Sequence, residues 1–307
     1  MRIQDPARFG RVAVAMGGDS AEREISLISG RAVTAALQRQ GIDAVPVDVG
    51  GRPLEALAGR GFDRVFNVVH GRGGEDGVLQ GLLEAVGLPY TGSGVLASAL
   101  SMNKVAAKLC WRGAGLPTPD WVVLETEADL ARCGDRLGFP VIVKPVLEGS
   151  SIGMAKAEDE AALDGAWQAA RVFGPVMAEA WIDGVEYTAA LLEDEMLPLI
   201  RLETPRTFYD FEAKYRADDT RYLCPCGLAA AEEWALRRLA WQACRVLGVS
   251  GWGRVDLFRD RRGRPWLIEV NTVPGMTDHS LVPMAARAAG IDFDQLVWRV
   301  LETSVTR

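Results

Sequence analysis

Two short segments late in the chain constrain its fold most, because their spacing predicts one antiparallel hairpin. Residues 252–258 and 265–270 have the alternating pattern of strands, and the Arg-Gly pair at 262–263 favours a turn between them. In the register that this turn sets, Asp256 lies opposite Glu269. Because side chains alternate between the two faces of a strand, we expect one face of the hairpin to be polar and the other to join the core.

The polar face of this hairpin gathers groups that suit a divalent cation. It comprises Arg254, Asp256, Glu269 and Asn271, whereas the apolar face comprises Val255, Leu257, Ile268 and Val270. Two carboxylates about 4 Å apart repel by roughly 4 kcal/mol at an effective dielectric near 20, so the pair needs a counter-charge. Mg2+ or Mn2+ supplies it and usually also binds substrate phosphates. The face therefore predicts a nucleotide site with metal ligands Asp256, Glu269 and Asn271. A salt-bridged face neutralised by Arg254 is the alternative.

Composition narrows the class of protein. With 307 residues, of which 49% are hydrophobic and 24% charged, the chain suits a soluble globular protein of two or three domains. A net charge of -7 argues against nucleic-acid binding, which needs a basic surface. No apolar run approaches the roughly 18 residues of a membrane span, and the charged N-terminus does not resemble a signal peptide, so we expect a cytoplasmic location. The five cysteines lack paired spacing and are expected to be free thiols.

Strand-like and helix-like segments alternate along the chain, which predicts α/β architecture, with α+β parts. The first unit has expected parallel strands at 11–16, 43–49 and 64–69, and helices at 24–40, 77–86 and 95–112. A second, smaller unit has expected strands at 121–124, 141–144 and 176–181, and helices at 129–137 and 161–173. The last unit has a polar stretch at 204–226, a long helix at 232–247 and the hairpin. We interpret residues 204–226 as a lid, because the stretch is too long for a simple connector.

Three segments bear on phosphate binding. The Walker pattern GxxxxGK[ST] does not occur, which excludes a P-loop. Residues 92–97 match GxGxxA, but no buried strand precedes them and no βαβ unit follows, so a Rossmann oxidoreductase has thin support. The loop 149–153 follows an apolar strand that ends at Lys144, and its small residues let backbone N–H groups approach phosphate oxygens. Alone it fits a hairpin turn; with Lys144 and the carboxylate hairpin it predicts a nucleotide clamp.

The order of these residues resembles the ATP-grasp fold. Longer segments at 17–26, 70–77 and 271–277 resemble the D-alanine–D-alanine ligase family, and the resemblance spans essentially the whole chain. It implies a three-domain ATP-grasp architecture: an N-terminal α/β substrate domain at 1–101, a central domain at 102–187, and a catalytic C-terminal domain at 188–307 that carries the lid.

The resemblance also implies an activity, the ATP-driven joining of two D-alanines through a D-alanyl phosphate for peptidoglycan precursors. Two molecules of D-alanine, one ATP and two Mg2+ or Mn2+ ions would be bound, and we expect a homodimer. Two alternatives stay open. One is another ATP-grasp carboxylate–amine ligase, including the D-alanine–D-lactate type. The other is a binding module without catalysis, which should lack a metal ligand or Arg254.

Residue roles follow from the resemblance for the nucleotide. ATP would be bound by Lys104, Lys144, Ser150, Ser151, Glu179, Trp181, Ile182, Glu186 and Lys214. Within this set, Glu179 would lie near the adenine amino group and Glu186 near the ribose hydroxyls, as suits carboxylates that only accept hydrogen bonds.

Further roles concern the two amino acids. Glu22 would hold the ammonium group of the first D-alanine in a network with Ser150 and Tyr215, and His70 would lie near its carboxylate. Ser280 would bind the second carboxylate. The resemblance assigns the tetrahedral oxyanion to Arg254 and the backbone N–H of Gly275. From the residues alone, Asp19 and Glu22 equally fit a capping box, and a lone histidine is often a hydrogen-bonded core residue. Tyr215 would favour D-alanine over D-lactate as acceptor.

Overall fold

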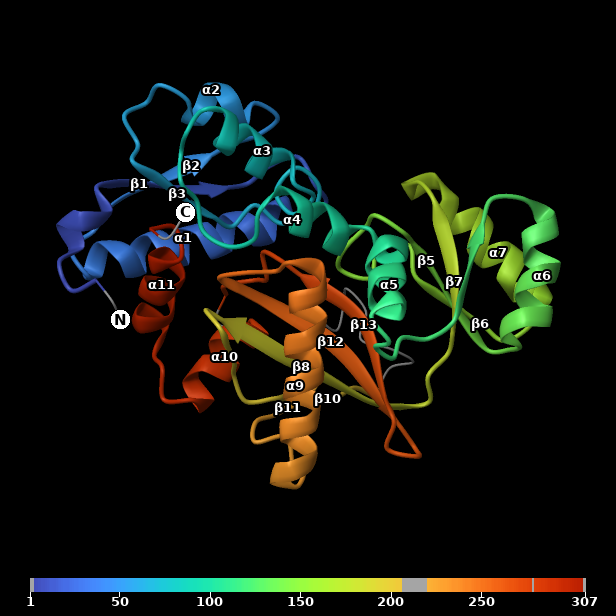
Figure 1. Cartoon of the computed structure of the whole chain (residues 1–307). Coiled ribbons are helices and arrows are strands. Elements are labelled where there is room, and N and C mark those ends of the chain that lie inside the picture. Colours follow the sequence, from blue (N-terminus) through green and yellow to red (C-terminus); the bar gives the residue numbers. More distant parts are fainter. Residues whose placement is uncertain (1–2, 206–219, 278, 306–307) are drawn as a thin grey trace.

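The strands form three sheets, one after another along the chain, in the residues that this computed structural model describes, namely 3–205, 220–277 and 279–305 (Figure 1). Lys214 and Tyr215, and much of the predicted lid, lie outside these described residues. The mixed α/β architecture expected from the alternation of segments is confirmed.

The first sheet is parallel, as predicted, with the order β2-β1-β3. Its central strand is apolar and buried along nearly its whole length, because helices cover such a sheet on its faces. The strands of this unit are β1 (Arg11–Met16), β2 (Asp43–Asp48) and β3 (Arg64–Asn67). Its helices are η1 (Pro6–Phe9), α1 (Arg23–Arg39), α2 (Pro53–Leu57) and α3 (Val78–Ala85).

The single helix predicted at 95–112 is wrong, because the structure has two helices there, α4 (Val95–Met102) and α5 (Lys104–Gly113). The break falls at Asn103, whose backbone is extended and whose side-chain oxygen accepts a hydrogen bond from the N–H of Ala106 at 3.0 Å. Asparagine is among the best residues at such an N-cap position. The break places Lys104 at the start of α5, where it is buried.

The second sheet is antiparallel, with the order β4-β7-β5-β6. Its strands are β4 (Trp121–Leu124), β5 (Val141–Pro145), β6 (Ala155–Ala157) and β7 (Val176–Ala180). Its helices are α6 (Glu127–Leu137), α7 (Glu160–Ala170) and η2 (Arg171–Phe173). The glycine- and serine-rich loop connects β5 to β6, and Ser150 and Ser151 have φ angles of 49° and 60°. Serine rarely adopts this left-handed conformation, so the loop is strained where the clamp was predicted.

The third sheet is also antiparallel, with the order β11-β10-β8-β12-β13 and β9 paired to β8. The sequence analysis found only its hairpin, and it missed the central strand β8. The strands are β8 (Gly184–Leu192), β9 (Glu195–Met196), β10 (Ile200–Glu203), β11 (Arg221–Leu223), β12 (Trp252–Asp260) and β13 (Pro265–Asn271). Helix α9 (Ala230–Leu247) packs on this sheet, and its apolar side shares a core cluster with β8, β12 and β13.

The register of the β12–β13 hairpin is as predicted at the site, because Asp256 pairs with Glu269 and Arg254 with Asn271. One residue further on, the register shifts and Leu257 pairs with Leu267. Ile268 is therefore the extra residue of a β-bulge. The expectation that Ile268 lies on the core face is wrong: Leu267 is fully buried in the core instead, and Ile268 lines a pocket.

The end of the chain returns to its beginning. Helices α10 (Leu281–Ala288) and α11 (Phe293–Glu302) follow the hairpin, and α11 packs against α1, as the red and blue helices in Figure 1 show. The ring of Trp298 meets the ring of Phe9 edge-on, with centroids 5.1 Å apart. The apolar cluster around them joins residues of the first and third sheets. The domain limits at 101 and 187 stay predictions.

Candidate active site

Two neighbouring pockets share the polar face of the β12–β13 hairpin. The polar pocket has a volume of about 670 Å³ and includes Arg254 and Asn271 in its lining. The apolar pocket has a volume of about 650 Å³ and includes Asp256 and Glu269. The hairpin thus presents the pair Arg254 and Asn271 to the polar pocket and the pair Asp256 and Glu269 to the apolar pocket.

The apolar pocket lies between the second and third sheets. Ile142 and Met154 line it from one side, and Phe258 and Ile268 line it from the other. Such an apolar slot suits the flat ring of a nucleobase. Most of the residues expected to bind ATP line this pocket. They are Lys144, Ser151, Glu179, Trp181, Ile182 and Glu186.

Glu179 is buried between two lysines. Its Oε1 lies 2.9 Å from the Nζ of Lys144, and its Oε2 forms an ion pair with Lys108. Burial alone would raise the pKa of Glu179, but the two ammonium charges outweigh it and hold that pKa below its usual value. Burial lowers the pKa of Lys108 to about 8. The carboxylate is therefore ionised and its position is fixed.

Lys108 is a residue that the sequence analysis missed. It is fully buried and also donates a hydrogen bond to Thr118 Oγ1 at 2.6 Å. The available signal was its place four residues after Lys104 on one helix, which puts both ammonium groups on the same side. Lysines on helices are normally solvated, so the pattern alone did not distinguish it.

The carboxylate of Asp256 has a complete set of protein partners. Arg254 contacts it with Nε at 2.9 Å and Nη2 at 2.7 Å, and Thr188 donates to it at 2.7 Å. Asn271 donates to it at 3.2 Å. Glu269 lies 3.5 Å from the Nζ of Lys104. In the described structure, the salt-bridged alternative considered from sequence is thus realised for Asp256.

These oxygen donors nevertheless fit a hard divalent cation. The cross-strand pair Asp256 and Glu269 and the amide of Asn271 offer only carboxylate and carbonyl oxygens, which Mg2+ and Mn2+ prefer. Within the described part of the chain, no group of three or more His, Cys, Asp or Glu is arranged to hold a metal ion. A cation here would therefore need further oxygen ligands, as a triphosphate supplies.

The polar pocket brings together residues that are far apart in sequence. Glu22, at the start of α1, accepts a hydrogen bond from the Ser150 hydroxyl of the β5–β6 loop. Glu22 is only 9% exposed and makes no capping hydrogen bond to its helix, which begins at Arg23. The capping-box alternative for Asp19 and Glu22 is therefore wrong.

The loop after β13 completes the polar pocket with Gly275 and Ser280. A Cβ atom at Gly275 would lie 2.7 Å from the Ser280 Oγ, so only glycine leaves that hydroxyl its place. Ser280 immediately precedes α10, where the free N–H groups of a helix start favour a carboxylate. Lys104 lies outside both pockets and donates to the Glu148 backbone carbonyl at 2.6 Å.

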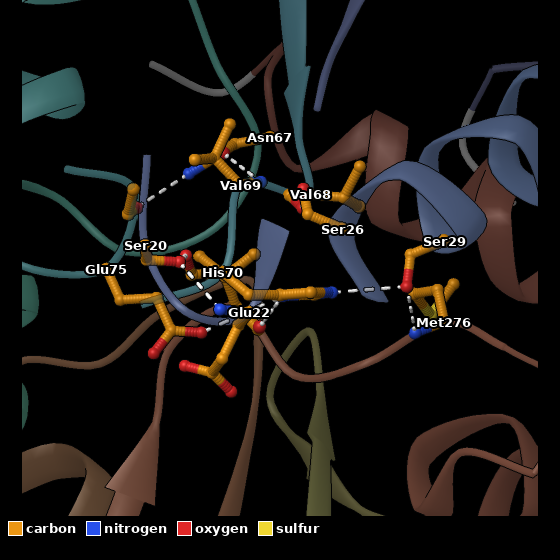
Figure 2. Close-up of polar contacts among 12 residues, drawn as sticks. Ser20, Glu22, Ser26, Ser29, Asn67, Val68, Val69, His70, Glu75 and Met276 are labelled. Atoms are coloured by element: carbon orange, nitrogen blue, oxygen red, sulfur yellow. Dashed lines mark hydrogen bonds and ion pairs between the residues drawn. The ribbon is translucent and has the colours of Figure 1, made fainter. Parts of the chain in front are cut away.

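His70 is buried beside the polar pocket, and both its ring nitrogens have protein partners (Figure 2). Nδ1 lies 2.8 Å from the Val273 carbonyl oxygen, and Nε2 lies 3.1 Å from the Ser29 Oγ. The hydrogen-bonded core histidine considered from sequence fits this geometry better than a direct substrate ligand.

Glu75 is the second residue that sequence reasoning missed, although it lies in the 70–77 segment that carried the resemblance. Its Oε1 is 3.8 Å from the Nδ1 of His70, and its side chain lines the polar pocket. Burial raises the pKa of Glu75 to about 7. Figure 2 shows its carboxyl group beside Glu22 and below the His70 ring.

Comparisons with known proteins agree with this geometry. Residues 49–93 match the family described as D-ala D-ala ligase N-terminus, and residues 110–302 match D-ala D-ala ligase C-terminus. The D-alanine–D-alanine ligase of Methylococcus capsulatus is 65% identical over 304 residues, covering 99% of this chain and 98% of that protein. The D-alanine–D-alanine ligase of Alkalilimnicola ehrlichii is 61% identical over 308 residues, covering 100% of this chain and 98% of that protein. Among the described helices, none is long and apolar enough to cross a membrane.

Solved structures of related enzymes share the fold over nearly the whole chain. The D-alanine–D-alanine ligase of Bacillus anthracis has a TM-score of 0.84 at 33% identity, covering 96% of this chain and 97% of that one. Its complex with ATP gives 0.82 at 32% identity and the same coverage. The VanG D-Ala:D-Ser ligase of Enterococcus faecalis has a TM-score of 0.84 at 29% identity, and the match covers 96% of this chain and 99% of that one. With its fold, its paired pockets and its full-length relatives in agreement, the chain belongs to the D-alanine–D-alanine ligase family.

Proposed function

We propose that this chain joins two D-alanine molecules to D-alanyl-D-alanine and converts ATP to ADP and phosphate. The observation that carries the proposal is the shared hairpin, which contributes a carboxylate pair to an apolar pocket and a guanidinium to a polar pocket. An enzyme that activates a carboxylate with ATP needs these two cavities in contact. The names and the full-length identity of the curated relatives support the same activity.

The first step would take place where the pockets meet. The adenine ring would lie between Ile142 and Phe258, with Glu179 and Glu186 accepting hydrogen bonds from its amino group and from the ribose. Lys144 would bind phosphate oxygens. A carboxylate oxygen of the first D-alanine would form a bond to the γ-phosphorus while the bond between that phosphorus and the bridging oxygen of ADP breaks. The products of this step are D-alanyl phosphate and ADP.

The second step would take place in the polar pocket. The neutral amine of the second D-alanine would attack the acyl carbonyl carbon, and the carbonyl oxygen would become an oxyanion. Arg254 and the N–H of Gly275 are the donors available to it. The carbon–oxygen bond to phosphate then breaks, phosphate leaves with the electron pair, and the nitrogen loses a proton. Glu22 would hold the ammonium group of the first D-alanine, and Ser280 the carboxylate of the second.

We further propose that Asp256, Glu269 and Asn271 bind Mg2+ or Mn2+. When bound, the two ions would neutralise charge on the triphosphate. The support is the donor set, two carboxylates and an amide on paired positions of adjacent strands. Thr188 contributes by holding Asp256 at 2.7 Å, which fixes the orientation of that carboxylate.

The choice of the second substrate needs its own test, because overall shape does not decide it. The structures of a D-alanine–D-alanine ligase and of a D-Ala:D-Ser ligase resemble this chain with the same TM-score of 0.84. Identity of 55–65% to curated D-alanine–D-alanine ligases favours D-alanine. Cytoplasmic location and a homodimer stay predictions, and sedimentation of the purified chain would test the homodimer.

The decisive experiment incubates the purified chain with ATP, Mg2+ and D-alanine, and measures ADP by a coupled assay and the product by mass spectrometry. D-alanyl-D-alanine and ADP should form in equal amounts. Parallel reactions replace half of the D-alanine with D-serine or D-lactate, or all of it with L-alanine. A mixed product formed faster than D-alanyl-D-alanine would favour the alternative ligase, and ATP binding without any product would favour the non-catalytic module.

A further inference from the structure

The loop from Val273 to Met276 is held at both ends by Ser29 and His70, which belong to the unit of the first sheet. The carbonyl oxygen of Val273 lies 2.8 Å from His70 Nδ1, and the N–H of Met276 donates to Ser29 Oγ at 3.2 Å. Ser29 Oγ in turn lies 3.1 Å from His70 Nε2. In Figure 2, one dashed line joins His70 to Ser29 and another joins Ser29 to Met276. Gly275, a proposed oxyanion donor, lies between the two attachment points.

The hydrogen atoms in this chain of hydrogen bonds can be placed by counting donors and acceptors. A carbonyl oxygen only accepts, so the Val273 oxygen requires a proton on His70 Nδ1. In the neutral ring, Nε2 is then an acceptor and takes the hydroxyl proton of Ser29. The Ser29 oxygen remains able to accept the N–H of Met276. Every donor then has an acceptor, and the four groups form an uninterrupted chain of hydrogen bonds.

We propose that Ser29 is a positioning residue of the ligase reaction, which acts with His70 to fix the N–H of Gly275 for the oxyanion. The effect on turnover rests on the proposed function, whereas the effect of Ser29 on the loop does not. Both residues are buried, with exposed fractions of 0% for Ser29 and 3% for His70. Solvent therefore cannot replace a lost partner without rearrangement. A preformed donor stabilises an oxyanion only if its direction is fixed before the reaction.

Ser26 provides a matched control on the same helix. It is also 0% exposed, accepts a backbone N–H, that of Gly17 at 2.8 Å, and donates to the Val68 carbonyl at 2.6 Å. Ser26→Ala and Ser29→Ala thus remove the same atoms from equally buried sites. Only Ser29 contacts the loop that contains Gly275. Any difference between the two variants reports on that loop and not on a general loss of buried hydrogen bonds.

The first test uses the full chain without substrates. Amide hydrogen exchange followed by mass spectrometry should be about tenfold faster in peptides covering 272–281 for Ser29→Ala, because the Met276 N–H loses its acceptor. For Ser26→Ala, the faster exchange should appear at 14–20 instead. Unchanged exchange at 272–281 in Ser29→Ala would overturn the proposal.

The second test uses the fact that the chain has only two histidines. In untagged protein labelled with nitrogen-15 histidine, His70 should carry its proton on Nδ1, and His279 serves as the internal reference. Ser29→Ala removes the donor to Nε2, so the His70 nitrogen signals should move, whereas Ser26→Ala should leave them in place. A wild-type proton on Nε2 would contradict the assigned hydrogen-bond chain.

The third test measures turnover. The kcat of Ser29→Ala should fall about 10- to 100-fold, less than the loss expected when an oxyanion donor is removed outright, with the KM for ATP nearly unchanged. The kcat of Ser26→Ala should fall by a smaller factor. An equal loss of kcat in both variants would overturn the positioning role. If the wild-type chain forms no dipeptide, the proposed function fails, while exchange and the histidine signals still decide whether Ser29 holds the loop.

Discussion

The guanidinium of Arg254 meets the carboxylate of Asp256 at two points, Nε to Oδ1 at 2.9 Å and Nη2 to Oδ2 at 2.7 Å. The two residues lie on the same face of β12, and each belongs to a different pocket. A two-point contact of this kind fixes the plane of both groups. The proposed oxyanion donor and the proposed metal ligand therefore orient each other, and a change at one should be felt at the other.

Arg254→Ala should lower kcat about 10²- to 10³-fold, the usual effect of losing an oxyanion donor, and should change the KM for ATP much less. Arg254→Lys keeps a positive charge beside Asp256 but loses the two-point geometry. Its kcat should therefore lie between those of the wild type and Arg254→Ala. Steady-state kinetics with ADP detection checks both variants. The control is Arg259→Ala, because Arg259 pairs with Glu232 at the far end of the same strand. Equal loss of nucleotide binding and turnover in Arg254→Ala would count against the oxyanion role.

Glu269→Gln should raise the Mg2+ concentration needed for half-maximal activity. The substitution keeps size and one oxygen but removes the negative charge that a hard cation prefers. Titration of ADP formation with Mg2+ at saturating ATP measures the effect. Glu232→Gln removes a carboxylate that contacts Arg259 near the surface and should leave the titration as in the wild type. An unaltered Mg2+ curve in Glu269→Gln would remove Glu269 from the ligand set.

Lys108→Met should weaken ATP binding about tenfold, equivalent to about 1.4 kcal/mol. With Lys108 gone, Lys144 becomes the remaining lysine on the buried Glu179 carboxylate and is less available to a phosphate. Isothermal titration with a non-hydrolysable ATP analogue gives the affinity. Arg112→Met, one turn along the same helix, breaks an exposed pair with Asp120 and should leave binding intact. Normal affinity with a reduced kcat in Lys108→Met would show that the lysine pair does not act through ATP.

Glu75 should make stability depend on pH. Burial raises its pKa from 4.5 to about 7, so between these values the folded chain holds a proton that the unfolded chain has released. More protons bound in the folded state means that stability falls as pH rises through this window. Glutamine cannot ionise, so the free energy of unfolding of Glu75→Gln does not contain this fall. From about pH 5 to about pH 8, it should rise relative to that of the wild type by about 1–3 kcal/mol.

Urea unfolding at the two pH values measures this difference. The exposed Glu195→Gln on β9 is the control and should keep the same stability relative to the wild type at both. A constant difference between Glu75→Gln and the wild type across the window would mean that Glu75 is ionised throughout.

Much of the fold was accessible from sequence because it depends on local patterns. The parallel first sheet and the cross-strand pair Asp256 and Glu269 follow from alternation and turn chemistry, which neighbouring residues set. The helix break at Asn103 was missed because apolar periodicity continues across it. Strand β8 was missed because its burial is imposed by β10 and β12 on its two sides.

The sequence by itself determined which chemical groups this protein has and, through its long motifs, the family to which it belongs. Only the tertiary structure decided how those groups are paired: Lys108 with Glu179, Arg254 with Asp256, and His70 with Ser29 and Val273. The physical reason is that a buried polar group takes the partner that the packed elements bring within hydrogen-bond distance. For His70 and Val273 that partner lies 203 positions away along the chain, beyond the reach of any local pattern.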